Sequence, residues 1–166
     1  MLPHLVRSLL SLICQGCSCE VEKGDAQFVD EDSFAFLAAP PVGIQLGAYC
    51  APCFDSKISA ELNRYNEKVE LAKNVNVFYT TQSKESRFVR RIERPVKVEN
   101  CDDREETLLR LAFLAVEMGK NSIVDVELKS EKVRNAGYQT SIWSGRGIPA
   151  HIDESALQRR FRGTPN

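Results

Sequence analysis

Three stretches of the chain place apolar residues every three or four positions, which is the spacing of an amphipathic helix. The first predicts a helix over residues 1–13, whose apolar face consists of Leu2, Leu5, Val6, Leu9, Leu10 and Ile13. Its polar face carries one strongly basic residue, Arg7, which is weak support for a membrane-surface anchor. We therefore expect this helix to pack on its own protein or on a neighbouring subunit.

Two further helices are predicted in the middle of the chain. From Asp55 onward, one apolar stripe contains Ile58, Leu62, Tyr65, Val69 and Ala72. Asp55 and Ser56 are its N-cap candidates, because a side-chain oxygen there can accept a hydrogen bond from the first turn. The other helix follows Asp103, with Glu106 in the capping-box position and Gly119 as the stop. Its predicted buried residues are Leu108, Leu111, Ala112, Ala115 and Met118.

Short β-rich segments precede the first of these two helices. Residues 33–37 and 44–49 predict the two strands of a hairpin, and Pro40-Pro41 ends the first strand because proline cannot donate to a ladder. Residues 20–32 are polar and acidic, which indicates a loop or an irregular strand. The first half of the chain therefore predicts little regular β-structure beyond one hairpin.

The second half predicts the element order β-β-α-β-β, an antiparallel-leaning sheet that carries one long helix. The β-rich segments cover residues 75–81, 88–98 and 122–129, and residues 138–143 and 147–152 together complete the set. Pro95 interrupts the second strand, and the strand over 122–129 is rich in β-branched residues and is expected at the centre of the sheet. The fold class predicted for the whole chain is α+β.

Two Cys-x-x-Cys pairs mark the first half, Cys14 with Cys17 and Cys50 with Cys53. Two intervening residues let a tight turn aim both sulfurs at one ion, and four thiolates make a closed tetrahedral zinc site. We call each turn that carries a Cys-x-x-Cys pair a knuckle. The order of a knuckle, a hairpin and a second knuckle at the start of a helix is typical of treble-clef and zinc-ribbon modules. We predict that these four cysteines bind Zn²⁺ and that the ion folds residues 14–74.

Two alternatives stay open for the cysteines. Cys19 could replace Cys17 in the zinc set, although an ordinary thiol is the simpler interpretation of both Cys19 and Cys101. The sequence from Cys50 to Cys53, at the start of a helix, also resembles the redox dithiol of thioredoxin-like proteins. The zinc interpretation is favoured because it uses all four cysteines and because residues 1–49 lack the βαβ unit of a thioredoxin fold.

The composition, 43% hydrophobic and 27% charged over 166 residues, is that of a soluble globular protein. A net charge of −1 argues against a protein built mainly to wrap nucleic acid. No stretch approaches the roughly 20 apolar residues of a transmembrane helix, and residues 1–13 lack the long apolar run of a secretion signal. Cysteines paired by a metal-site motif favour a reducing compartment, and the cytoplasm is expected.

Four features of the second half carry a resemblance to a known family. They are Thr80-Thr81 at the end of a strand, the alanine-rich helix, the turn over residues 118–124, and the closing segment 144–150. Together they resemble the YbjQ-like family, small bacterial proteins described as heavy-metal-binding, over about residues 75–152. The resemblance implies an α+β domain that assembles into homo-oligomeric rings through sheet edges and helices. It implies no catalytic residue.

The remaining candidate chemistry is sparse. Gly145-Arg146-Gly147 predicts a tight turn more readily than an anion cradle, and Gly119 with Asn121 predicts a sharp helix-to-strand turn. His151 and Asp153 would supply half of a metal or acid–base site, so a surface position is expected for His151. The tail over residues 153–166 holds three arginines, and a solvated terminus is expected there.

The sequence therefore predicts a non-enzymatic protein with no catalytic site. Its parts are an N-terminal helix (1–13), a zinc module (14–74), an oligomerising YbjQ-like domain (75–152) and a basic tail (153–166). Binding or assembly is the expected role, with an unidentified protein partner. The alternatives are a metal-handling or sensing protein and a dithiol oxidoreductase.

Overall fold

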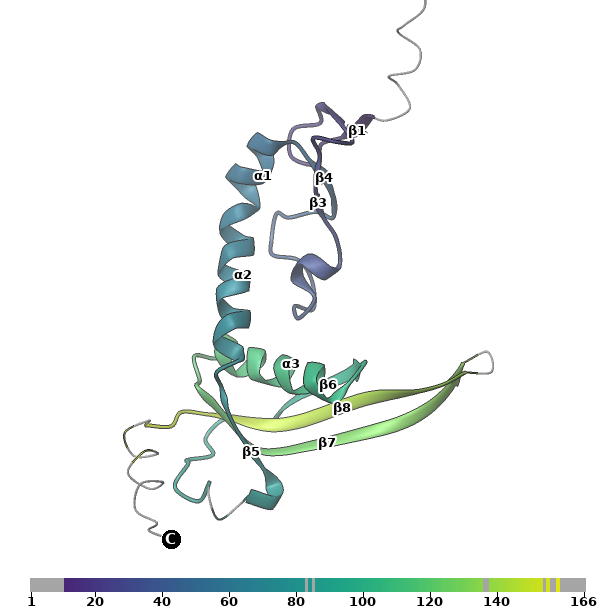
Figure 1. Ribbon diagram of the computed structural model, residues 1–166. Helices are drawn as coiled ribbons and strands as arrows, with labels where there is room; N and C mark the ends of the chain where they lie inside the picture. The colour runs from purple at the N-terminus through teal and green to yellow at the C-terminus, as the bar shows by residue number, and fades with distance from the viewer. Residues whose placement is uncertain are drawn as a thin grey trace, which may run out of the picture. The chain divides into compact units, whose positions relative to one another are not determined.

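The computed structural model describes residues 11–82, 84, 86–135, 138–153, 155 and 158. The chain forms two compact units, Met1–Glu67 and Lys68–Asn166, each with its own helices and strands (Figure 1). The predicted α+β class is confirmed. Within the described ranges, no helix is long and apolar enough to cross a membrane.

The first unit contains two small antiparallel sheets. β1 (Ser11–Ile13) pairs with β2 (Glu20–Glu22), and β3 (Gln27–Val29) pairs with β4 (Gly47–Tyr49). The helix predicted over residues 1–13 is wrong for Ser11–Ile13, which form a strand because they pair with β2; residues 1–10 lie outside the described part.

The strand predicted over residues 33–37 is also wrong. The chain forms a 3₁₀ helix there, η2 (Asp32–Phe34), followed by turns. The Ser33 N–H donates to Asp30 Oδ1 at 2.9 Å and the Asp30 N–H donates to Ser33 Oγ at 3.1 Å. Such local side-chain bonds compete with a strand ladder. The partner of β4 is instead β3, within the segment predicted as a loop or irregular strand.

Two consecutive helices follow β4, namely α1 (Ala51–Lys57) and α2 (Ser59–Ala72). The predicted N-cap at Asp55 or Ser56 is wrong, because the helix begins earlier, with Cys50 as N-cap and Pro52 in the first turn. Proline is favoured there, since the amides of the first turn have no partner inside the helix. Ile58 is fully buried in the core of the first unit, which also contains Val21, Val29, Phe34 and Tyr49.

The second unit is a four-stranded sheet in the order β5-β7-β8-β6. β5 (Asn76–Tyr79) is parallel to β7 (Ser122–Asn135), which pairs antiparallel with β8 (Tyr138–Ala150); β6 (Val96–Cys101) pairs antiparallel with β8. The predicted order β-β-α-β-β and the inner position of the strand from residue 122 are confirmed.

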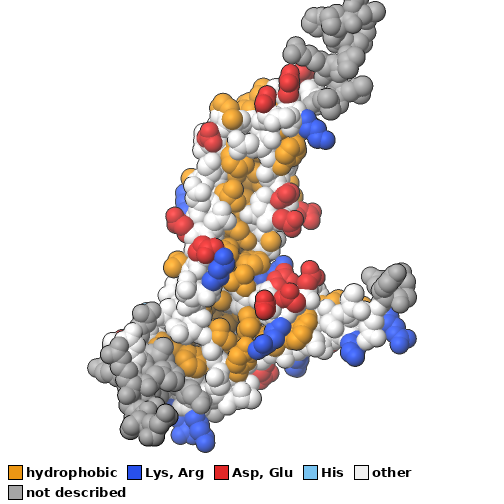
Figure 2. Space-filling view, in the orientation of Figure 1, with side chains coloured by type: hydrophobic (Ala, Val, Ile, Leu, Met, Phe, Trp, Pro, Cys, Tyr) orange, Lys and Arg blue, Asp and Glu red, His pale blue; other side chains and the backbone are white. Residues whose placement is uncertain are grey.

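β7 and β8 are longer than predicted and continue beyond their neighbours as a two-stranded ribbon (Figure 1). Basic side chains lie along this ribbon (Figure 2). The segments predicted over 138–143 and 147–152 belong to one strand, so the turn predicted at Gly145-Arg146-Gly147 is wrong. Gly145 and Arg146 pair with both β6 and β7, and Gly147 pairs with β6; this pairing keeps the three residues extended.

α3 (Arg104–Glu117) packs against one face of this sheet. The predicted capping is confirmed, because Asp103 Oδ1 accepts a hydrogen bond from the Glu106 N–H at 2.7 Å. Gly119 ends the helix with a φ of 68°, as the stop signal indicates. Leu111, Ala112 and Ala115 are buried as predicted. Met118 is 40% exposed, because the chain leaves helical geometry at this C-cap residue.

Candidate metal centre

The first knuckle is the turn of the β1–β2 hairpin. The Ser18 N–H donates to the Cys14 carbonyl and the Cys14 N–H donates to the Cys19 carbonyl, both at 2.9 Å. Ser18 completes the turn with a φ of 60°. These bonds bring the Cys14 and Cys17 side chains to one side of a short loop.

The second knuckle connects β4 to α1. Cys50 is the N-cap of α1 and Cys53 lies within its first turn. The Gln15 N–H donates to the Ala48 carbonyl at 2.9 Å, which joins the two knuckles through their backbones. A Cβ at Gly16 would lie 2.8 Å from both Cβ and Sγ of Cys53, so only glycine permits this approach. Sequence reasoning missed Gly16, whose place between the first two cysteines was the available signal.

The knuckles bring together the four cysteines that the sequence selects. The sulfurs of Cys14, Cys17, Cys50 and Cys53 all lie within 4.8 Å of one another. Cys14 Sγ is 3.7 Å from Cys50 Sγ, and Cys17 Sγ is 3.8 Å from Cys50 Sγ. Cys14 is buried, Cys50 and Cys53 are partly buried, and Cys17 is exposed. The four sulfurs are close enough to hold one metal ion.

Backbone amides favour a thiolate at the buried position. The Cys50 and Gly16 N–H groups donate to Cys14 Sγ, each at 3.3 Å. These bonds, that from Cys50 foremost, lower the pKa of Cys14 to about 6. Hydrogen bonding to the sulfurs of Cys17 and Cys50 raises the pKa of Cys53 to about 12. Crowded thiolates repel one another, and a divalent cation would remove this repulsion.

A fifth sulfur lies beside the cluster. Cys19 is exposed, and its Sγ is 3.2 Å from Cys17 Sγ. Hydrogen bonding to Cys17 raises the pKa of Cys19 to about 12. This position keeps open the alternative in which Cys19 replaces Cys17. Cys101, in contrast, is buried in β6 of the second unit.

The structure brings together no comparable second site among the residues it describes. Apart from the four cysteines, no group of three or more His, Cys, Asp or Glu side chains converges there. His151 is exposed, as expected, and Asp153 is exposed too. His4 and the arginines of the tail (Arg159, Arg160 and Arg162) lie outside the described residues.

Comparisons with known proteins add no relative. No family model matches the chain, no curated protein matches it, and no solved structure matches it. The resemblance to the YbjQ-like family therefore stays a prediction.

Proposed function

We propose that this chain is a non-enzymatic binding or assembly protein whose first unit is folded around a structural Zn²⁺. The observation that carries the proposal is the convergence of four cysteine sulfurs within 4.8 Å of one another, from two knuckles far apart in the sequence. Zinc suits this donor set, because soft thiolates in fours are typical of structural zinc sites. Four sulfur ligands leave no open position for water, so the ion would organise the fold without catalysing a reaction.

The size of the first unit supports a structural role for the ion. Among its described residues the sheets have two strands each, and the large buried side chains of its core are Phe34, Tyr49 and Ile58. Two-stranded sheets of three residues are marginal by themselves. A structural zinc ion supplies on the order of 10 kcal/mol of folding free energy to a small module. The metal would therefore decide whether this unit folds.

We also propose that the second unit assembles into a YbjQ-like homo-oligomer. The support is the sheet order, which leaves β5 and β6 as edge strands. An edge strand presents unpaired N–H and C=O groups that another chain can use. Native mass spectrometry of the full chain would report the number of subunits, and a monomer at micromolar concentration would contradict this part of the proposal.

The exposed sulfurs favour a second candidate, a metal-handling or sensing protein. Cys17 and Cys19 are both exposed and their sulfurs are 3.2 Å apart, so a spare thiol lies beside a proposed ligand. A transfer site would exchange its zinc within minutes with a competing chelator, whereas a structural site would hold it for hours. The dithiol oxidoreductase is the third alternative, since Cys50 caps a helix that contains Cys53. It predicts reduction of insulin disulfides by the purified protein.

Metal analysis of the full chain tests the zinc proposal. We expect one zinc ion per chain by inductively coupled plasma mass spectrometry, and loss of that zinc in Cys14→Ser and Cys53→Ser. Cys101→Ser is the matched control, because this cysteine is also buried but lies in β6 of the other unit. Wild-type protein without zinc, or Cys14→Ser with a full complement of it, would contradict the proposal.

A further inference from the structure

The segment over residues 86–95, which we name the basic loop, carries four arginines and one acidic residue. It connects η3 (Thr80–Gln82) to β6. The sequence predicts a strand from residue 88, but the structure has turns, bends and irregular backbone outside any sheet up to Pro95. The loop's four arginines therefore do not alternate across the two faces of a sheet; they are Arg87, Arg90, Arg91 and Arg94.

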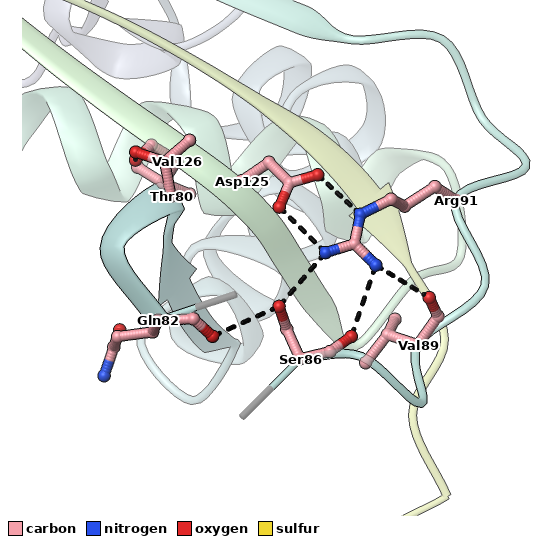
Figure 3. A network of polar contacts seen from close by, with 7 residues as sticks. All are labelled: Thr80, Gln82, Ser86, Val89, Arg91, Asp125 and Val126. Atoms are coloured by element: carbon pink, nitrogen blue, oxygen red, sulfur yellow. Dashed lines mark hydrogen bonds and ion pairs between the residues drawn. The ribbon is translucent and has the colours of Figure 1, made fainter. Parts of the chain in front are cut away.

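Arg91 links the basic loop to β7 of the sheet through hydrogen bonds and an ion pair (Figure 3). Its Nε and Nη2 donate to the two carboxylate oxygens of Asp125 in β7, at 2.5 and 2.8 Å. Its Nη1 donates to the carbonyls of Ser86 and Val89, at 3.3 and 3.1 Å. The ion pair lowers the pKa of Asp125 and raises that of Arg91. Arg91 is thus occupied inside the protein.

Apolar contacts fix the same loop a second time. Val89 is buried and Phe88 is half-buried in a cluster with Phe78, Val124 and Ile152. These residues cover part of the sheet face opposite α3. A loop held both by a bidentate ion pair and by buried apolar side chains is preorganised, so binding a ligand to it costs little ordering entropy.

The other three arginines of the loop point to an anionic partner. Arg87, Arg90 and Arg94 are exposed, and within the described residues none of their side chains forms an ion pair or hydrogen bond. The one acidic residue of the loop, Glu93, is neutralised by Lys120 at 2.7 Å. The loop therefore presents three guanidinium groups, which bind phosphate in a planar, bidentate geometry.

A hollow adjoins Arg90, one of these three arginines. It has a volume of about 510 Å³, and its lining includes Phe88, Arg90, Ile92 and Pro149 together with the carboxylates of Glu93 and Asp153. The guanidinium of Arg90 thus stands next to an apolar wall that contains an aromatic ring, and Lys120, which also lines the hollow, neutralises Glu93. A positively charged surface beside an aromatic platform is the combination that holds phosphates and unstacked bases together.

We propose that the basic loop and this hollow bind single-stranded nucleic acid. Arg87, Arg90 and Arg94 would contact successive phosphates, and an unstacked base would enter the hollow beside Phe88. A duplex keeps its bases stacked and would not use the hollow. The chain's net charge of −1 does not reveal this basic surface, because it sums two units of opposite sign. Met1–Glu67 has more acidic than basic residues, whereas Lys68–Asn166 has more basic than acidic residues. The site lies in the second unit and does not depend on zinc.

Fluorescence anisotropy with a labelled oligothymidine of about 20 nucleotides tests the proposal. The probe is titrated with the full-length protein at about 50 mM and about 200 mM salt. We expect Arg87→Gln/Arg90→Gln/Arg94→Gln to weaken binding at least about tenfold at the lower salt. The slope of log affinity against log salt should fall by about 2, since three single-strand phosphate contacts are removed.

The matched control removes the same charge elsewhere in the second unit. Lys129→Gln/Lys132→Gln/Arg134→Gln changes three exposed residues of β7 on the ribbon, and the affinity should stay within about threefold. Thermal unfolding confirms that both triple variants fold. If the triple variant of the basic loop does not fold, the single variants Arg87→Gln and Arg90→Gln are tested instead. Each of them must weaken binding of the oligothymidine, or the proposal is wrong.

Four outcomes would overturn the proposal. They are no binding of the oligothymidine at the lower salt, an equal loss in both triple variants, tighter binding of a duplex of the same length, and binding only to anionic phospholipid vesicles. The last of these would assign the loop to a membrane surface instead. Loss of zinc binding in a cysteine variant leaves the predicted oligonucleotide affinity unchanged, so this proposal and the zinc proposal fail separately.

Discussion

At Gly145 in β8, the sheet and α3 come too close for a side chain. A Cβ there would lie 2.7 Å from Thr107 Cγ2 and 2.9 Å from Leu111 Cδ1. Both neighbours are fully buried, so neither can move aside without disturbing the packing of α3. The glycine that suggests a turn in the sequence is thus needed for close packing of a helix on a strand.

We expect Gly145→Ala to lower the free energy of unfolding by about 1–3 kcal/mol, the usual effect of overpacking a buried contact. Urea unfolding followed by circular dichroism measures it. Ser144→Ala is the control. Ser144 is adjacent to Gly145 in the strand, so its side chain points to the opposite face, and the substitution adds no Cβ because serine already has one. An unchanged midpoint for Gly145→Ala would show that α3 tolerates a shift away from the sheet.

Among the elements, the basic loop depends most on a contact between distant parts of the chain. Asp125 has a φ of 53° where the register of β7 against β8 shifts, and its carboxylate binds Arg91. The Ser86 hydroxyl, on the same network, accepts from Arg91 Nη2 at 3.1 Å. This irregularity in a central strand is thus what positions the loop, as β-bulges often do for functional segments.

The Arg91–Asp125 pair should make the second unit sensitive to acid. Because the pKa of Asp125 lies below its ordinary value of 3.8 in the folded state, the pair contributes fully above that value. The contribution is lost as the pH falls through the lowered pKa. We expect Asp125→Asn to cost about 1–2 kcal/mol at pH 7, and the difference from wild type to shrink towards pH 2, in urea titrations at each pH.

Glu99→Gln is the control for this measurement. Glu99 forms an ion pair with Lys97, and the two side chains are 59% and 63% exposed, respectively. Such surface pairs contribute at most about 1 kcal/mol to the free energy of unfolding. A loss at neutral pH as large as that of Asp125→Asn would contradict the special role of the Arg91 network. So would a difference for Asp125→Asn that does not change with pH.

The whole molecule consists of two units with separate cores. The core of the first unit is built around Tyr49 and Ile58, next to the cysteines, whereas those of the second lie on the two faces of its sheet. A change that destabilises one unit should therefore leave the other unit folded. The proposed zinc ion would stabilise the first unit only.

We expect a strong zinc chelator at neutral pH to unfold the first unit and leave the second folded. Hydrogen exchange with mass spectrometry should show loss of amide protection in β1 to β4 and in α1, and unchanged protection in β7 and β8. Cys101→Ser should behave as wild type does. Loss of protection in both units would contradict their independence, and loss in neither would contradict the structural role of the metal.

Features that depend on neighbours in the sequence could be predicted without the structure. The spacing of Cys14 with Cys17 and of Cys50 with Cys53 selects the four sulfurs, since a two-residue turn imposes their common direction. The cap at Asp103 and the stop at Gly119 are equally local, because each rests on groups within one helical turn. The periodicity of the apolar residues found α2 and α3 for the same reason, but it wrongly predicted a helix at Ser11–Ile13, where pairing with β2 forms a strand.

Features that depend on distant residues could not be predicted in this way. A strand is predicted over residues 88–98, but only residues 96–98 of it join β6, and the pairing of Arg91 with a carboxylate 34 residues away holds residues 88–95 as a loop. Gly145 and Gly147 have the composition of a turn, but the pairing of Gly145 with strands on both sides and of Gly147 with β6 keeps them extended. Local preferences amount to tenths of a kcal/mol per residue, whereas buried packing and paired backbone groups contribute several times more, so long-range contacts prevailed at these positions.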